Sequence, residues 1–384
     1  MTIEETLLDW TPTLHVMAMG LVIALGPLAW IWLRKGKHST DRRIHMLTVA
    51  TLFLTFDLVV FGAFTRLTDS GLGCPDWPGC YGHMSPVGAA QDIAQAQSVM
   101  PDGPVTFAKA WIEMIHRYLA TGVGVLILVL ALFSSFDRKR HGRSVVWPWL
   151  TLVWVCVQGA FGALTVTLKL FPAIVTLHLM GGLGLLALLR WQQMTSPWYE
   201  AGHGGYAYLQ TPTVGLRRAV KAVLALLTVQ IALGGWVSTN YAVMACTDFP
   251  TCHGTWWPAM DFSSAFEVWR DLGHTASGAL LPFEALVAIH YVHRLMAYVV
   301  VLAMLVLGLA LWRRAMLAPA IAIWTLTMWQ FLSGLSNVVL GWPLMGALAH
   351  TAGAAALVIL LVGWWASARR CETLGYAANR RYFL

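Results

Sequence analysis

The stretch Glu113-Met114-Ile115-His116-Arg117-Tyr118 places a carboxylate and an imidazole three residues apart at one end of a long apolar segment. Positions i and i+3 lie on the same face of a helix, so the two side chains are predicted to face the same way. Ionisable groups inside a membrane helix are costly and mark functional sites. The pattern returns in altered form as His290-Tyr291-Val292-His293-Arg294-Leu295, which makes it the centre of the predicted fold.

The composition indicates an integral membrane protein. Of the 384 residues, 58% are hydrophobic and only 11% are charged, whereas a soluble domain is about 25% charged. The net charge is +7, but the basic residues lie in short loops. We therefore relate them to membrane topology and expect no nucleic-acid partner.

Nine apolar segments come close to the roughly 20 residues that a helix needs to cross a bilayer. They lie at 12–33, 46–67, 108–133, 147–168, 172–190, 218–238, 284–312, 317–340 and 346–367. Residues 1–10 are acidic and lack a basic n-region, so no cleavable signal peptide is expected.

The basic residues predict which loops are cytoplasmic. Nineteen of the 25 Lys and Arg fall in five stretches, at 34–44, 137–143, 190–221, 313–314 and 369–384. All five lie on one side of the membrane if the N-terminus is outside and residues 369–384 are cytoplasmic. The loops 68–107 and 239–283 are then predicted to lie outside.

Each outer loop opens with two cysteines at the same spacing. An oxidising exterior favours a disulfide within each loop, which gives the pairs Cys74–Cys80 and Cys246–Cys252. Four free thiols are one alternative. A zinc site with His83 or His253 is another, and it is disfavoured because each loop offers only two cysteines and one nearby histidine.

An internal repeat sets the predicted architecture. Equivalent residues lie 172 positions apart, as in Cys74 and Cys246, Gly62 and Gly234, Gln158 and Gln330, Gly162 and Gly334, and His178 and His350. His116 and His293 lie 177 apart, which a longer second outer loop explains. The repeat predicts an all-α integral membrane protein of two pseudo-symmetric tandem four-helix bundles, with one extra N-terminal helix.

This architecture divides the chain into four parts. The extra N-terminal helix occupies 1–44 and the N-terminal four-helix half occupies 45–191. A cytoplasmic linker follows at 192–217, and the C-terminal half with its tail occupies 218–384.

Each half offers two histidines at matching depth, His116 with His178 and His293 with His350. Two imidazoles on different helices of a bundle suit the two axial positions of a heme iron. The alternative is a set of hydrogen-bonded interior histidines. Other metal ions are disfavoured, because two histidines alone make a poor zinc or copper site.

The two halves differ at one position, because Glu113 aligns with His290. A carboxylate beside a heme-sized pocket can handle protons or stabilise a cationic intermediate. The alternative is a structural hydrogen bond to a neighbouring helix. Arg117 and Arg294 are candidates for contacts with heme propionates, or for side chains that reach the outer surface.

These motifs together resemble the heme A synthase family. The resemblance rests on Gly62-Ala-Phe-Thr-Arg-Leu-Thr-Asp-Ser-Gly-Leu-Gly-Cys-Pro-Asp-Trp-Pro-Gly-Cys80, on Glu113-Met-Ile-His116-Arg, and on the paired histidines, and it runs from about residue 45 to 369. It implies oxidation of the C8 methyl group of heme O to a formyl group, giving heme A for terminal oxidases. It also implies a bacterial inner-membrane location.

The resemblance assigns a role to each candidate residue. It implies that His293 and His350 are axial ligands of a heme b cofactor, that His116 and His178 bind the substrate heme, and that Glu113 is catalytic. The implied partners are heme O, membrane lipid and an electron acceptor, with heme O synthase or oxidase assembly factors as further candidates. The alternative functions are a diheme b-type membrane cytochrome that oxidises quinol, and a heme carrier or exporter.

Overall fold

The computed structural model describes residues 11–33, 39–141, 144–199 and 213–381, and these residues form helices and loops without a β-strand. Within them, eight helices are long and apolar enough to cross a membrane. They are α2 (Thr11–Leu33), α3 (Thr40–Leu67), α5 (Phe107–His141), α6 (Val146–Thr167), α7 (Pro172–Met194), α8 (Val214–Thr239), α10 (Phe283–Trp312) and α12 (Leu344–Arg381). The class of protein predicted from composition is confirmed: an all-α integral membrane protein.

The predicted ninth span corresponds to α11 (Leu317–Val339), which is long enough at 23 residues but is not among these eight helices. Its polar residues, among them Gln330 and Ser333, lower its mean hydropathy. Three short elements lie in the loops, namely α4 (Ala90–Val99), α9 (Phe262–Ala265) and the 3-10 helix η2 (Ala242–Ala245).

Polar residues fix where several helices begin. The hydroxyl of Ser39 accepts a hydrogen bond from the N–H of Arg42 at the start of α3, and Thr213 does the same for Leu216 at the start of α8. Such caps satisfy backbone donors that have no partner within the helix. Half of the predicted linker 192–217, at 200–212, lies outside the described residues, as do parts of the basic stretches 34–44 and 137–143.

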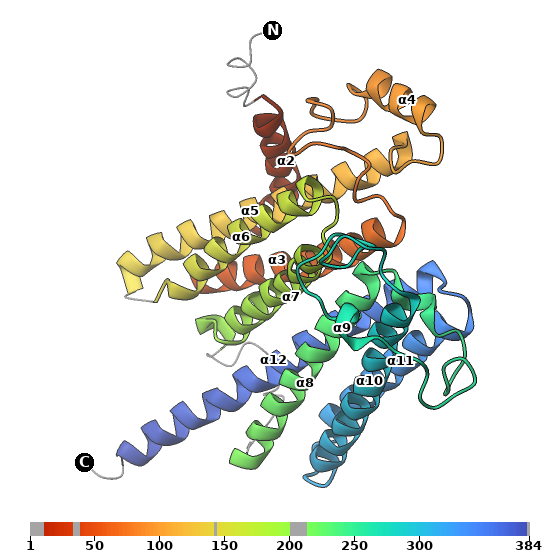
Figure 1. The fold of residues 1–384 in the computed structure, drawn as a ribbon. Helices are drawn as coiled ribbons and strands as arrows, with labels where there is room; N and C mark the ends of the chain where they lie inside the picture. Colours follow the sequence, from red (N-terminus) through yellow and green to blue (C-terminus); the bar gives the residue numbers. More distant parts are fainter. Residues whose placement is uncertain (1–10, 34–38, 142–143, 200–212, 382–384) are drawn as a thin grey trace. The chain divides into compact units, whose positions relative to one another are not determined.

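The described chain divides into two compact units, Met1–Ile174 and Val175–Leu384. In the first unit, α5 is the central helix and packs against α2, α3 and α6 (Figure 1). The extra N-terminal helix α2 lies mainly along α5. The pair Glu113 and His116 is therefore carried by the helix with the most neighbours in its unit.

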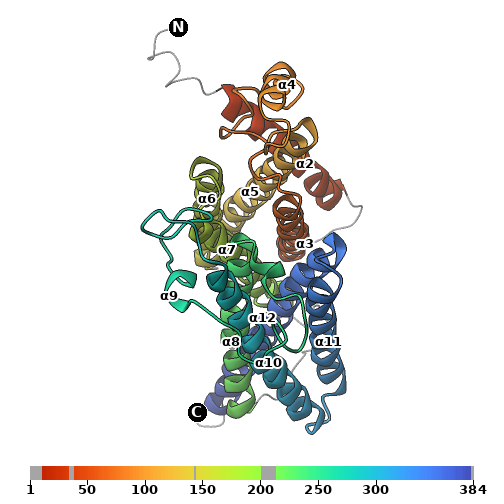
Figure 2. The ribbon, with the colours of Figure 1, turned by 45° about the vertical axis from the view of Figure 1, so that its right-hand side comes forward.

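The second unit contains a closed ring of four helices. Helix α8 packs against α10, α10 against α11, α11 against α12, and α12 against α8 (Figure 2). In such an arrangement, side chains on facing helices meet in the interior of the bundle. His293 on α10 and His350 on α12 belong to this ring.

Most of α7 groups with the second unit. The hydroxyl oxygens of Thr176 and Thr239 lie 3.2 Å apart, and the rings of Trp191 and Trp365 pack edge to face at 5.1 Å. These contacts join α7 to α8 and α12. The contact-based division thus falls within α7, and the predicted domain boundary after residue 191 stays a prediction.

Candidate functional site

His293 lies against a glycine of the facing helix. A Cβ atom on Gly234 of α8 would come within 2.9 Å of Cε1 of His293. Real Cβ atoms do not approach other atoms this closely, so only glycine leaves room for the ring here. The amide of Gln230, one turn earlier on α8, lies with its Nε2 3.1 Å from Nδ1 of His293.

His350 is accommodated in the same way on the other side of the bundle. A Cβ atom on Gly334 of α11 would lie 3.0 Å from Cε1 of His350. The hydroxyl oxygen of Ser333 lies 3.1 Å from Nδ1 of the same ring. The imidazoles of His293 and His350 are close enough for their charges to interact, and their joint binding of one heme stays a prediction.

His290, which lies one turn before Arg294, has both ring nitrogens engaged. Its Nδ1 donates to the carbonyl of Ala242 at 3.0 Å, and its Nε2 accepts from Arg294 at 3.5 Å. An imidazole whose Nδ1 donates one hydrogen bond and whose Nε2 accepts another has no free lone pair for a metal. Of the two histidines in the α10 motif, His293 is therefore the candidate ligand.

In the first unit, His116 lies against Gly62 of α3, where an added Cβ atom would be 3.0 Å from Cε1. The ring of Phe61 is stacked near His116, with centroids 6.2 Å apart and an interplanar angle of 12°. His178 is half-buried on α7, in the part that groups with the second unit. The pairing of His116 with His178 therefore stays a prediction.

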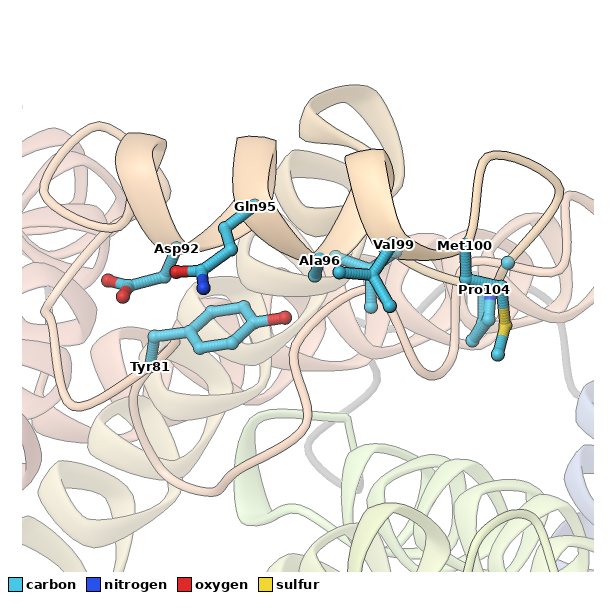
Figure 3. Close-up of a pocket in the computed structure, with 9 residues that line it drawn as sticks. Tyr81, Asp92, Gln95, Ala96, Val99, Met100 and Pro104 are labelled. Atoms are coloured by element: carbon cyan, nitrogen blue, oxygen red, sulfur yellow. The ribbon is translucent and has the colours of Figure 1, made fainter.

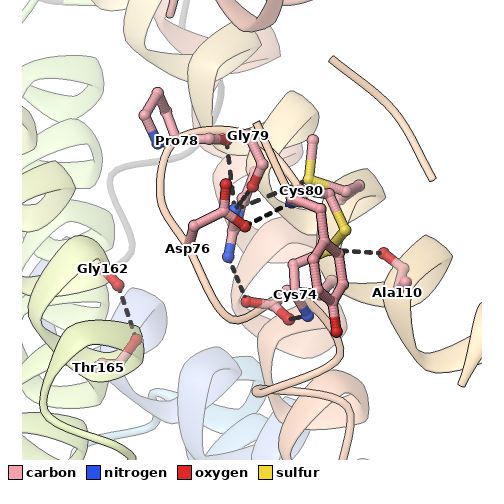
Figure 4. A network of polar contacts seen from close by, with 12 residues as sticks. Cys74, Asp76, Pro78, Gly79, Cys80, Ala110, Gly162 and Thr165 are labelled. Carbon is pink, nitrogen blue, oxygen red and sulfur yellow. Dashed lines mark hydrogen bonds and ion pairs between the residues drawn. A yellow bond between two sulfur atoms is a disulfide. The ribbon is translucent and has the colours of Figure 1, made fainter. Parts of the chain in front are cut away.

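Glu113 forms a buried ion pair and also holds the first outer loop. Its Oε1 accepts from Nη2 of Arg117 at 2.5 Å, and its Oε2 accepts from the backbone N–H of Cys74 at 2.8 Å. Both side chains are buried, with 4% of Glu113 and 8% of Arg117 exposed. Arg117 also donates to the carbonyls of Pro78 and Gly79. Figure 4 shows the loop from Cys74 to Cys80 around this network.

Arg294 makes the equivalent contacts in the second unit. It donates to the carbonyls of Thr251 at 2.6 Å, Pro250 at 3.4 Å and Cys246 at 3.3 Å. Pro250 and Thr251 lie 172 positions after Pro78 and Gly79. Both arginines are buried rather than extended to the outer surface. Their predicted contact with heme propionates stays a prediction.

The disulfide predictions are confirmed. Cys74 is bonded to Cys80, and Cys246 is bonded to Cys252. In each loop an aspartate accepts two backbone N–H bonds just after the second cysteine. These bonds join Asp76 to Tyr81 and Gly82, and Asp248 to His253 and Gly254. The residue before each glycine has positive φ, and so does the glycine, which is why glycine suits that position.

A cavity of about 480 Å³ lies in the first outer loop, and none of the four candidate heme histidines lines it (Figure 3). It is lined by α4 and by Tyr81, and Figure 3 shows the ring of Tyr81 beneath Asp92 and Gln95. Burial raises the pKa of Tyr81, and the carboxylates of Asp76 and Asp92 raise it further. No motif from the sequence maps to this cavity.

The second unit fits a heme better than a bare metal ion. Among the described residues, no three His, Cys, Asp or Glu side chains cluster as a metal cage would require. His293 and His350 instead form a pair on facing helices, and each has a hydrogen-bonding group beside Nδ1. For His350 the printed contact is at Nδ1, which leaves Nε2 as the natural iron ligand. For His293 the amide nitrogen of Gln230 lies 3.1 Å from Nδ1 and 3.4 Å from Nε2, so Nε2 can bind iron only when the amide has turned away from it. Gln230 and Ser333 were not predicted from the sequence. Gln230 lies four positions before Gly234 and Ser333 lies one position before Gly334, and both glycines belong to the repeat.

Fold and site together define a class, a membrane helical protein with paired histidines in a helix bundle and disulfide-closed outer loops. The family model for cytochrome oxidase assembly protein (COX15-CtaA) matches residues 45–362. The chain belongs to this family.

Relatives named heme A synthase match most of the chain. The protein from Shewanella oneidensis is 37% identical over 314 residues, which cover 81% of this chain and 92% of the relative. The protein from Caulobacter vibrioides is 26% identical over 83% of this chain and 93% of the relative. The protein from Halalkalibacterium halodurans is 26% identical over 75% of this chain and 85% of the relative.

Proposed function

We propose that the chain is a heme A synthase, which oxidises the C8 methyl group of heme O to a formyl group and so supplies heme A to terminal oxidases. The observation that carries this proposal is the 37% identity to a relative named heme A synthase along 92% of that relative. The site agrees with it, because the family's Glu-x-x-His motif lies on the central helix of the first unit.

In this proposal the second unit would hold a heme b cofactor through His293 and His350. Heme b, when bound, supplies one-electron transfer. The chain's own contribution is to hold two imidazoles on different helices of the bundle, each against a glycine. An external electron acceptor completes the reaction.

In this proposal the predicted N-terminal half, residues 45–191, receives heme O, with His116 and His178 as the histidines that bind it. Glu113 lies three residues before His116, on the same helical face. Both of its oxygens already accept hydrogen bonds, from Arg117 and from Cys74. This arrangement favours a fixed negative charge that stabilises positive charge at the methyl carbon over a free base that takes up a proton.

The proposed arrangement in the membrane follows the repeat. Two pseudo-symmetric four-helix halves follow the extra helix α2, and α11 is the ninth span. The chain lies in the bacterial inner membrane with its N-terminus outside and its C-terminus in the cytoplasm. The two outer loops make the same arginine-to-carbonyl and N–H-to-aspartate hydrogen bonds at loop positions 172 residues apart, and this supports the proposed pseudo-symmetry.

The test is expression in a host that makes heme O but no heme A, followed by chromatography of the extracted hemes. A heme A synthase makes the formyl-bearing heme appear. The matched control is His116→Ala, which leaves the proposed heme b ligands intact. Heme O unchanged by the wild-type protein, despite a bound b-type heme, would instead identify an electron-transfer cytochrome.

A further inference from the structure

The hydrogen bonds of Ser333 determine how His350 carries its proton. A hydroxyl has one hydrogen, and that of Ser333 has two acceptors within reach, the backbone carbonyl of Gln330 at 3.3 Å and Nδ1 of His350 at 3.1 Å. When the hydrogen goes to Gln330, the hydroxyl oxygen accepts from an N–H on Nδ1 of His350. In that tautomer Nε2 keeps a lone pair for a ligand.

Gln230 holds His293 from the facing helix. Its Nε2 lies 3.1 Å from Nδ1 and 3.2 Å from the backbone oxygen of His293, and its Oε1 is buried without a hydrogen-bond partner among the described residues. Half a turn of the amide exchanges the two ends and presents Oε1 to an N–H on Nδ1. The amide nitrogen then gives up its bond to the backbone oxygen of His293 and its 3.4 Å contact with Nε2 of the ring, so that Nε2 can bind iron.

The equivalent positions of the first unit cannot do this. Leu58 and Phe161 lie 172 residues before Gln230 and Ser333. The alignment of the two units at this offset is supported by Gly62 and Gly234, each of which lies against a histidine ring. A hydrocarbon side chain offers neither a donor nor an acceptor to an imidazole.

We propose that Gln230 and Ser333 are positioning residues that hold the Nδ1 side of the two heme-ligand histidines, and so set the affinity and the reduction potential of the heme in the second unit. The inference rests on the proposed heme b site. It also explains why the two units differ: a resident cofactor needs oriented ligands, whereas a substrate heme has to leave after conversion.

The direction of each effect follows from ligand chemistry. An acceptor on Nδ1–H makes the imidazole more basic, which stabilises ferric iron and lowers the potential. Loss of such a partner costs about 10- to 100-fold in metal affinity. We therefore expect Gln230→Met and Ser333→Ala each to speed ferric heme release to apomyoglobin by roughly 10- to 100-fold and to raise the midpoint potential. Gln230→Glu should shift the potential in the opposite direction, because a carboxylate is a stronger acceptor.

Two matched controls separate positioning from general damage to the bundle. Ser336→Ala removes a hydroxyl of α11 that bonds the carbonyl of Ser333, and Thr228→Val removes one of α8 that bonds the carbonyl of Leu224. Both controls should keep the wild-type potential and release rate.

The experiment measures purified protein by redox titration, electron paramagnetic resonance and heme transfer, and it does not depend on heme A formation. Wild-type potential and release in Gln230→Met and Ser333→Ala would overturn the inference. If Gln230→Met fails to accumulate, the other two variants decide. A raised midpoint potential in Ser333→Ala with a lowered one in Gln230→Glu supports the inference, and midpoint potentials that shift in the same direction in both variants refute it.

The proposed function and the inference can fail separately. His293→Ala and His350→Ala should lose the tightly held low-spin heme, while His116→Ala and His178→Ala should keep it. If the first two variants kept that heme, the heme b assignment itself would be wrong. If they lost it and the Gln230 and Ser333 variants were unchanged, only the positioning role would be refuted.

Discussion

Glu113 carries a charge and a structural contact at the same time, so its substitution has to separate the two. Gln in its place keeps an oxygen that can accept the N–H of Cys74, but removes the negative charge beside His116. An Ala removes both. The two substitutions therefore distinguish an electrostatic role from a role in holding the loop.

We expect Glu113→Gln to express normally, to keep the heme b spectrum and to lose about 10²- to 10³-fold in heme A formation, the range for removal of one preorganised electrostatic group. Unconverted heme O, or a partly oxidised alcohol, should accumulate and be seen by chromatography. Heme A formation by Glu113→Gln near the wild-type rate, with failure of Glu113→Ala alone, would show a purely structural role.

Arg117 is the other partner of this ion pair, and its substitution leaves Glu113 as the unpaired charge. Removing one partner of a buried pair leaves an uncompensated charge and costs about 3–5 kcal/mol. Arg117→Leu should therefore lower the thermal stability of the purified protein, measured by its unfolding temperature. The double variant Glu113→Gln with Arg117→Leu should recover part of that loss. Equal stability of single and double variants would mean that the pair is not coupled in solution.

At the scale of single elements, the two outer loops repeat one design. In each, a disulfide closes seven residues and an aspartate accepts from two N–H groups just after the second cysteine. An arginine from the next long helix donates to two loop carbonyls in the first loop and to three in the second. The loops differ at the tyrosine that binds them, Tyr118 to Met84 in one and Tyr291 to Trp256 in the other. The acceptors Met84 and Trp256 lie at equivalent positions of the repeat, whereas the donors Tyr118 and Tyr291 lie one helical turn apart in the alignment of the two motifs.

The sequence predicted these loops well but their contacts poorly. Spacing and compartment were enough for both disulfides, because a short cysteine spacing limits the choice of partner. The place of Arg117 and Arg294 could not be predicted, since a long side chain near a helix end reaches either water or a folded-back loop. Only the loop conformation decides between them. Gln230 and Ser333 were missed for a similar reason, because a lone polar residue in a span does not reveal its partner.

Asp248 gives the second loop a dependence on pH. The hydroxyl of Thr251 and the N–H groups of Gly254 and His253 hold the pKa of Asp248 below its usual range. A lowered folded-state pKa stabilises the loop above the unfolded value of about 3.9, and this stability is lost as the pH falls below that value towards the folded pKa.

Hydrogen exchange of residues 252–255, corrected for intrinsic rates, should therefore show protection that is constant above about pH 5 and declines from there to about pH 2. Asp248→Asn should show less protection and little decline. The exposed loop carboxylate of Asp271 provides the control, and Asp271→Asn should behave like the wild type. The same decline in wild type and Asp248→Asn would assign the pH dependence to another group.

At the scale of the whole molecule, the unsettled element is α11. Length and hydropathy identify eight candidate spans among the described residues, and α11 is outside that set. Yet α11 packs against α10 and α12 within the four-helix ring and carries Gly334 against His350. A helix with neighbours on both sides can bury polar residues that would be costly against lipid. Packing in the bundle therefore compensates for the lower hydropathy of α11.

This argument predicts that the turns at the two ends of α11 lie on opposite sides of the membrane. The first turn includes Arg314 and the second includes Gly341. In a background with Cys156 and Cys371 replaced by Ser, Arg314→Cys should react with an impermeant maleimide only from the cytoplasmic side, and Leu340→Cys only from outside. Intact spheroplasts and inverted vesicles supply the two directions of access. If both cysteines reacted from the same side, α11 would be a re-entrant or surface helix. The predicted nine spans, with the N-terminus outside and the C-terminus inside, would then be wrong.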